Sequence, residues 1–269
     1  RIGGLSIFHK LMPPVREVVP STGPVVLFSD DLDVRVVGPM DHFSASLIVL
    51  EGDDLVLGLH GEIDEVPPGF SHRWLVVEGR GIRDTIGRWG DELLADRGRV
   101  RGQRQPDVGT ERLGYWTDNG AAYYYKTAAG MNEADTLLAV KADADARGIP
   151  LGYMQIDSWW YEKEPGFPPG GLIEWVPKPE VFPDGIPALT QALGLPLIAH
   201  NRWFAQGNAY RDTVAFVDDE AMSHPLDGAV YDELLAQAQA WNLATYEQDW
   251  LVPAYWGNRW LRQAPDRVE

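Results

Sequence analysis

The segment ATYEQDW places two carboxylates, Glu247 and Asp249, two positions apart in an apolar and aromatic run. Because successive side chains of a strand point to opposite faces, this spacing predicts both carboxylates on one side of a strand. Carboxylates are costly to bury unless they are paired or used. A carboxylate at the end of a strand can attack an anomeric carbon, and we predict this catalytic role, that of nucleophile, for Asp249. The alternative is that Asp249 caps the following helix.

Three more segments place polar and aromatic residues directly after an apolar run, and together with the end of ATYEQDW they suit a sugar ligand. Indole rings stack on the apolar faces of a pyranose while carboxylates accept hydrogen bonds from its hydroxyl groups. The predicted substrate-binding residues are Trp116, Asp118, Asp157, Trp159, Trp160, His200, Arg202, Trp203, Glu247 and Trp250.

Several of these residues have an ordinary structural alternative. Asp157 serves equally well as a cap or turn residue, and Asp118 lies in a DNG sequence that is also typical of turns. A single histidine at a strand end, such as His200, is more often a hydrogen-bonded structural residue than a ligand. Arg202 falls on the same side of its strand as His200, where it would orient neighbouring carboxylates and lower their pKa values.

The elements that must position these residues alternate between strand and helix from Leu113 onward. The sequence predicts strands within 113–125, 149–161, 195–204 and 243–251, and helices over 132–148, 186–194 and 229–242. This alternation predicts an α/β fold with parallel strands, and polar residues at their carboxyl ends are typical of the active site of a (β/α)8 TIM barrel. A full barrel needs roughly 250 residues, so we interpret 113–269 as the first half of a TIM-barrel catalytic domain, incomplete after four strands. An open doubly wound sheet is the alternative, but no Gly-rich phosphate-binding sequence follows the first strand.

The preceding region is rich in short β-branched runs separated by turn residues. We interpret 1–80 as a β-sandwich portion with a truncated start, in which EGDD joins the two strands of a hairpin. Residues 81–98 predict a helix with one apolar face, formed by Ile82, Ile86, Trp89, Leu93 and Leu94. With the polar stretch that follows, this helix makes 81–112 a linker between the two domains.

Composition limits the classes of function. Asp and Glu number 40 against 23 Lys and Arg, and the net charge of −17 disfavours nucleic acid and anionic membranes as partners. The absence of Cys rules out disulfides and thiolate chemistry. The six His show no closely spaced pair, so we expect no metal site and no cofactor. We see no signal peptide and no apolar run long enough for a membrane span, and the compartment stays open.

Taken in order, LGYWTDNGAAYYY, PLGYMQIDSWWY, LPLIAHNRW and YEQDWL resemble the first four barrel strands of α-galactosidase-like glycoside hydrolases, above all the melibiase and raffinose-synthase type. The resemblance implies a β-sandwich before the barrel, Asp249 as the nucleophile, and Asp157 with Trp159 as the residues that bind hydroxyls of the non-reducing sugar. It places the general acid/base on a sixth strand, beyond residue 269. The family lysine of the fourth strand is replaced here by Glu247. The resemblance therefore does not extend to galactose specificity.

The expected function is a retaining glycoside hydrolase acting on an α-glycoside of galactose or a related neutral sugar, with a carbohydrate as its partner. The chain by itself is expected to be inactive, because the half of the barrel with the acid/base is missing. One alternative is an inactive homologue that binds carbohydrate without cleaving it. A second, less favoured, is a metal-dependent hydrolase on the same barrel.

Overall fold

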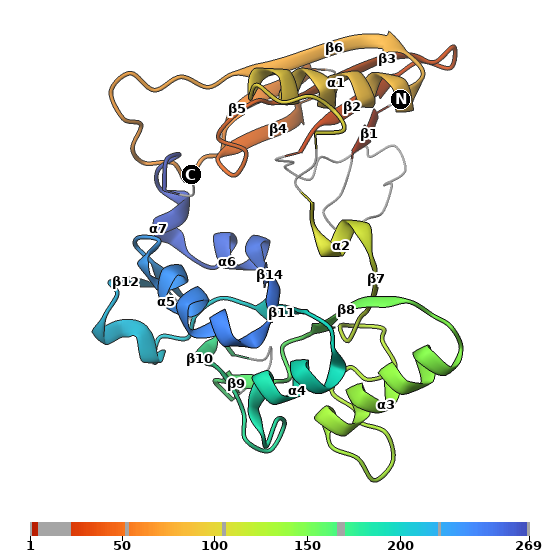
Figure 1. The fold of residues 1–269 in the computed structure, drawn as a ribbon. Coiled ribbons are helices and arrows are strands. Elements are labelled where there is room, and N and C mark those ends of the chain that lie inside the picture. Colours follow the sequence, from red (N-terminus) through yellow and green to blue (C-terminus); the bar gives the residue numbers. More distant parts are fainter. Residues whose placement is uncertain are drawn as a thin grey trace. The chain divides into compact units, whose positions relative to one another are not determined.

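The computed structural model describes residues 2–4, 23–51, 54–103, 106–165, 170–219 and 222–267. They form two compact units (Figure 1). The β-rich unit consists of Arg1–Arg104 and Arg259–Glu269, and the α/β unit of Gln105–Asn258. These units divide the chain differently from the predicted domains, because the helix expected in the linker and the last residues of the chain both group with the β-rich unit.

The β-rich unit is built on an antiparallel sheet with the strand order β1-β2-β3-β6. Its elements are β1 (Ile2–Gly4), β2 (Val25–Phe28), β3 (Asp33–Pro39), the hairpin β4 (Ser46–Glu51) and β5 (Asp54–Leu59), β6 (Trp74–Arg80), α1 (Ile82–Asp96) and α7 (Arg259–Arg262). The predicted helix is confirmed as α1, and β4 and β5 pair antiparallel on either side of EGDD, whose central residues 52–53 lie outside the described residues. Ile86 and Trp89 of α1 pack against buried Val34 and Val36 of β3, as the apolar face predicts.

The α/β unit is built on a parallel sheet with the order β14-β11-β8-β7. The strands of this sheet are β7 (Leu113–Tyr115), β8 (Leu151–Ile156), β11 (Leu197–Asn201) and β14 (Leu243–Gln248). The helices of the unit are α2 (Val108–Glu111), α3 (Glu133–Ala146), α4 (Gly185–Leu193), η1 (Ala209–Asp212), α5 (Ala229–Gln237), η2 (Ala238–Trp241) and α6 (Leu251–Trp256). The prediction of a mixed α/β fold with four parallel strands is confirmed. The strands do not close into a barrel within the described residues, so the half-barrel interpretation stays a prediction.

Local sequence explains where the helices of this unit begin and end. The side chain of Asn132 accepts a hydrogen bond from the backbone N–H of Asp135 at 2.8 Å and caps α3, as predicted. Gly148 follows that helix with a φ of 70°, a value that glycine adopts without strain. The third predicted helix ends as α-helix at Gln237 and continues as the 3-10 turn η2.

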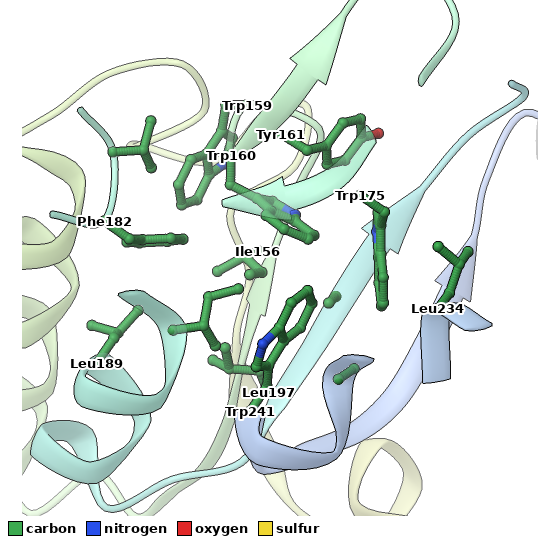
Figure 2. Packing of buried hydrophobic residues seen from close by; sticks show 14 of the residues in the cluster. Ile156, Trp159, Trp160, Tyr161, Trp175, Phe182, Leu189, Leu197, Leu234 and Trp241 are labelled. Carbon is green, nitrogen blue, oxygen red and sulfur yellow. The ribbon is translucent and has the colours of Figure 1, made fainter. Parts of the chain in front are cut away.

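One face of the parallel sheet is apolar and carries the core of the unit. Met154 and Ile156 of β8 and Leu197 and Ala199 of β11 are fully buried against residues of α3, α4 and α5, which flank these strands in Figure 1. Figure 2 shows Ile156 and Leu197 packed together with Leu189 of α4. Since side chains alternate along a strand, Gln155 of β8 and His200 of β11 face the other side of the sheet.

Two hairpins interrupt the strand–helix alternation, and the sequence reading did not predict them. One pairs β9 (Tyr161–Lys163) with β10 (Leu172–Pro177), and the other pairs β12 (Phe216–Asp219) with β13 (Met222–Pro225). The first carries Trp175, whose ring lies 5.5 Å from that of Trp160 and 5.0 Å from that of Trp241 (Figure 2). This aromatic packing holds the β9–β10 hairpin onto the core at the carboxyl end of β8.

Candidate active site

The carboxyl ends of the parallel strands lie side by side and bring four of the predicted acids together. In the register of the sheet, Ile156 is paired with Ala199, and Asn201 with Gln248. The residues that follow these strands therefore meet at one edge of the sheet. This edge is where parallel α/β folds place ligands.

Asp249 directly follows β14, and two hydrogen bonds hold its carboxylate. His200 Nε2 lies 3.3 Å from Oδ2, and the backbone N–H of Trp250 donates to Oδ1 at 2.6 Å. The bond to His200 lowers the pKa of Asp249, and the Trp250 bond adds to this against an opposing effect of burial. The side chain is 51% exposed, so the carboxylate is both ionised and open to a ligand.

His200 links two of these acids. Its ring is 1% exposed, and Nδ1 lies 2.8 Å from the hydroxyl of buried Tyr161. Nε2, besides its contact with Asp249, lies 3.8 Å from Oδ2 of Asp157. The imidazole is thus held between a tyrosine and two carboxylates, which suits a residue that orients Asp249.

Asp157 follows β8 and is 2% exposed. Its Oδ1 accepts a hydrogen bond from the hydroxyl of Ser158 at 2.8 Å. Its Oδ2 accepts no hydrogen bond from any residue that the structure describes. A buried carboxylate oxygen without a donor is costly, so this atom has an unfilled capacity to accept a hydrogen bond.

Glu247 is oriented by Gln155 and Thr117, two residues that the sequence did not predict as part of the site. The backbone N–H of Thr117 donates to Oε1 of buried Gln155 at 3.0 Å, which leaves the amide Nε2 to donate to Glu247 Oε2 at 2.8 Å. Burial raises the pKa of Glu247, against a smaller lowering by the Gln155 bond. Gln155, two residues before Asp157, shares its side of β8, a period-2 relation that could have pointed to it.

The pKa of Asp118 is also raised. Burial is the main cause, and the charges of Asp157 and Asp249 add to it, while a backbone hydrogen bond from Asn119 opposes them. The site therefore joins one carboxyl group with a lowered pKa, Asp249, to two with raised pKa values. Such a separation allows carboxyl groups of one site to take different roles.

Arg202 stacks with two of the predicted tryptophans. Its guanidinium carbon lies 5.0 Å from the ring of Trp203 and 5.4 Å from that of Trp250, and the two rings are 5.0 Å apart. Trp250 has a φ of 61°, a left-handed conformation that is unusual for a bulky residue. Backbone strain of this kind persists only where surrounding contacts hold it, and it is frequent at active sites.

The other predicted aromatic residues lie in different environments. Trp116 is 55% exposed. Trp159 packs against Phe182 and donates its ring N–H to Thr117 Oγ1 at 3.3 Å, while Trp160 is fully buried in the core. Because Trp159 and Trp160 are buried, neither ring is open to stack on a sugar.

The β-rich unit contains an Asp–His–Ser arrangement that resembles a catalytic triad. His72 Nδ1 lies 2.9 Å from Asp41 Oδ1, and its Nε2 lies 3.1 Å from Ser46 Oγ. However, Ser46 is fully buried and donates its only hydroxyl proton to the carbonyl oxygen of His42 at 2.7 Å. These residues therefore hold strands together rather than form a nucleophilic site.

The described residues contain neither a metal-binding cluster nor a membrane-spanning helix. No group of three or more His, Asp or Glu side chains among them is arranged to hold a metal ion. None of their helices combines the length and the apolar character that crossing a membrane requires.

No protein-family model and no curated protein matches the chain. Among solved structures, it is similar to an α-galactosidase from Lactobacillus brevis, with a TM-score of 0.52 and 13% identity over 82% of this chain and 32% of that one. An α-N-acetylgalactosaminidase from Bifidobacterium bifidum gives a TM-score of 0.48 and 12% identity, over 82% of this chain and 43% of that one. The chain thus spans less than half the length of either enzyme. At these identities the likeness establishes the fold alone, which is that of glycoside hydrolases.

Proposed function

We propose that the chain is part of a retaining glycoside hydrolase that acts on an α-glycoside, with Asp249 as its nucleophile. The observation that carries the proposal is the half-exposed carboxylate of Asp249, which two hydrogen bonds hold in its ionised form at the carboxyl edge of the parallel sheet. The glycosidase-like fold supports it. An ionised and oriented carboxylate is the group that a retaining mechanism requires.

In the proposed reaction, an oxygen of Asp249 bonds to the anomeric carbon while the bond from that carbon to the leaving oxygen breaks. The leaving oxygen takes a proton from a general acid, and water then cleaves the glycosyl ester as the same residue acts as base. From the resemblance to α-galactosidase-like enzymes, we expect this acid/base on a later barrel strand than the one that precedes Asp249. His200 contributes by orienting the nucleophile.

Three acceptors around Asp249 suit a neutral sugar with several hydroxyl groups. Asp157 offers the Oδ2 that receives no hydrogen bond from a described residue, and Glu247 and Asp118 flank it. Ionised Glu247 accepts hydrogen bonds and donates none, unlike the lysine found in the resembling family. We therefore propose that the substrate presents a hydroxyl donor to Glu247, in a sugar or ring orientation different from that of an ordinary galactoside.

Asp249→Ala tests the proposal in the complete protein. Hydrolysis of aryl α-glycosides is expected to fall roughly 10⁶-fold, as when the nucleophile of another covalent mechanism is removed. Azide should restore turnover by attacking the anomeric carbon in place of the missing carboxylate. Asp184→Ala is the matched control, because Asp184 is an exposed carboxylate whose side chain caps no helix.

Undiminished hydrolysis by the Asp249→Ala protein would exclude Asp249 as the nucleophile. A wild-type protein that binds sugars in calorimetry yet cleaves none would instead favour the alternative of a carbohydrate-binding homologue.

A further inference from the structure

Lys163, the last residue of β9, contacts the loop between β7 and α3. Its Nζ donates hydrogen bonds to the hydroxyl of Tyr125 and to the backbone carbonyl of Ser158. It also lies 4.6 Å from the ring centroid of Tyr125, within the range of a cation–π contact. A residue of the unpredicted β9–β10 hairpin thus reaches the loop that carries Asp118.

The direction of each hydrogen bond beyond Tyr125 follows from the number of protons available. Ser158 has one hydroxyl proton and donates it to Asp157 Oδ1 at 2.8 Å. The contact of 2.8 Å between the hydroxyls of Tyr125 and Ser158 must then be donated by Tyr125. Tyr125 has no second proton, so its oxygen accepts from Lys163. The result is a chain of donors that runs from Lys163 through Tyr125 and Ser158 to the carboxylate of Asp157.

The charge of the Lys163 amine determines whether these hydrogen bonds keep their direction from Lys163 to Asp157. An ammonium group has only donors, and it obliges Tyr125 to turn its proton toward Ser158. A neutral amine has a lone pair and can accept the tyrosine proton itself. Tyr125 would then no longer donate to Ser158, and the hydrogen bond from Ser158 to Asp157 would lose its support from Tyr125 and Lys163.

We propose that the Lys163 ammonium is a positioning group that orients Asp157, and with it the loop that carries Asp118, through Tyr125 and Ser158. This inference rests on the proposed function, in which Asp157 binds a substrate hydroxyl. Lys163 acts through other residues and needs no contact with the reacting atoms.

Groups from several elements act on the charge of Lys163. Burial lowers its pKa to about 7, and the charges of Arg202 after β11 and Lys178 after β10 lower it further, while Asp157 and Glu162 oppose them. The ring of buried Tyr161 also faces it, with its centroid 5.8 Å from Nζ. The ammonium form is therefore lost near neutral pH, and the support of Asp157 is lost with it as the pH rises.

The test compares Lys163→Arg, Lys163→Met and the control Lys126→Met, which removes an exposed lysine from the same loop as Tyr125. In the complete wild-type protein, kcat/KM is expected to fall above about pH 7. Arginine stays protonated, so Lys163→Arg should retain activity and keep only the alkaline decline that the general acid itself imposes. Lys163→Met should be roughly tenfold to a hundredfold less active at pH 6, a size typical of lost positioning. Lys126→Met should match the wild type.

A double-mutant cycle with Tyr125→Phe tests the connection between the two residues. If Lys163 acts through Tyr125, the Lys163→Met/Tyr125→Phe protein should lose no more activity than the more damaged single variant. The same cycle is read from Tm, without any substrate, and should also be non-additive. A second readout of Tm uses its pH dependence. Between pH 10 and 7 the unfolded wild-type chain holds a proton on Lys163 that the native wild type has released, so the wild type loses stability as the pH falls. Lys163→Met lacks this effect, and its Tm should therefore increase relative to that of the wild type.

Additive cycles in both activity and Tm would overturn the positioning role and leave the proposed function standing. Absence of hydrolysis in the wild type would overturn the proposed function. A non-additive Tm cycle would then still support the structural coupling of Lys163 to Tyr125.

Discussion

At the scale of single residues, the site separates four carboxyl groups by their surroundings. Asp249 has a lowered pKa because a histidine and a backbone N–H donate to it, whereas burial raises the pKa values of Glu247 and Asp118. Asp157 keeps one oxygen that accepts no hydrogen bond from a described residue. The same residue type can therefore serve as nucleophile or as hydroxyl acceptor within one small site.

His200→Leu should shift the acid limb of kcat/KM to higher pH. The bond from His200 is the largest cause of the lowered pKa of Asp249, so its loss raises that pKa and the nucleophile becomes protonated at a higher pH. The pH profile of aryl glycoside hydrolysis measures the shift. His224→Leu, on β13, is the control. An unchanged acid limb in a folded His200→Leu protein would show that His200 does not set the ionisation of Asp249.

At the scale of elements, the β9–β10 hairpin supports the site from beyond the sheet. The ring N–H of Trp175 on β10 donates to the carbonyl oxygen of His200 at 2.9 Å. Gly171, next to the hairpin strand, packs so tightly that a Cβ there would lie 2.5 Å from the backbone nitrogen of Ala205. The hairpin therefore fixes the backbone at the end of β11, where His200 and Arg202 lie.

Trp175→Phe should destabilise the α/β unit more than Trp160→Phe does. Both rings are fully buried, but the N–H of Trp160 donates to no described residue, whereas loss of the Trp175 N–H leaves the His200 carbonyl without that donor. The expected difference is about 1–2 kcal/mol in the free energy of unfolding. Urea unfolding followed by circular dichroism measures it, and equal losses would contradict the role given to this bond.

At the scale of the whole molecule, the chain leaves the β-rich unit and returns to it. The backbone N–H groups of Asp64 and Glu65 donate to the carbonyl oxygen of Gln263 at 2.8 and 3.1 Å, and Gln263 Nε2 donates to the Asp64 carboxylate at 3.0 Å. Arg262 forms an ion pair with Glu62. The segment after Asn258 is thus a structural part of the β-rich unit.

Removing residues 259–269 should therefore loosen the β-rich unit at 62–65. Amide exchange at Asp64 and Glu65 is expected to become fast, because these groups lose their acceptor. The amide of Asp249, which donates to Asn201 O at 2.9 Å within the α/β unit, serves as the internal control. Hydrogen exchange followed by mass spectrometry reads both regions, and unchanged protection at 62–65 would show that other contacts hold this segment.

Periodicity in the sequence predicted what depends on neighbours along the chain. Helix α1 has an apolar stripe at a spacing of 3.6 residues, Asn132 caps α3, and each parallel strand is an apolar run that ends in polar residues. These are local properties, so a single sequence is enough to show them. The sequence did not predict the β9–β10 hairpin, because its strands are short and their pairing is irregular. Its stability comes from aromatic packing with Trp241, which is distant in sequence.

By itself, the sequence determined that polar and aromatic residues collect at the carboxyl ends of parallel strands, with Asp118, Asp157, Glu247 and Asp249 among them. Only the tertiary structure decided what surrounds each of them. It placed Trp159 and Trp160 in the core, set Gln155 against Glu247, and joined Lys163 to Asp157 through two hydroxyls. Burial and hydrogen bonding depend on contacts between residues distant in sequence, and these contacts set the pKa and accessibility of each group.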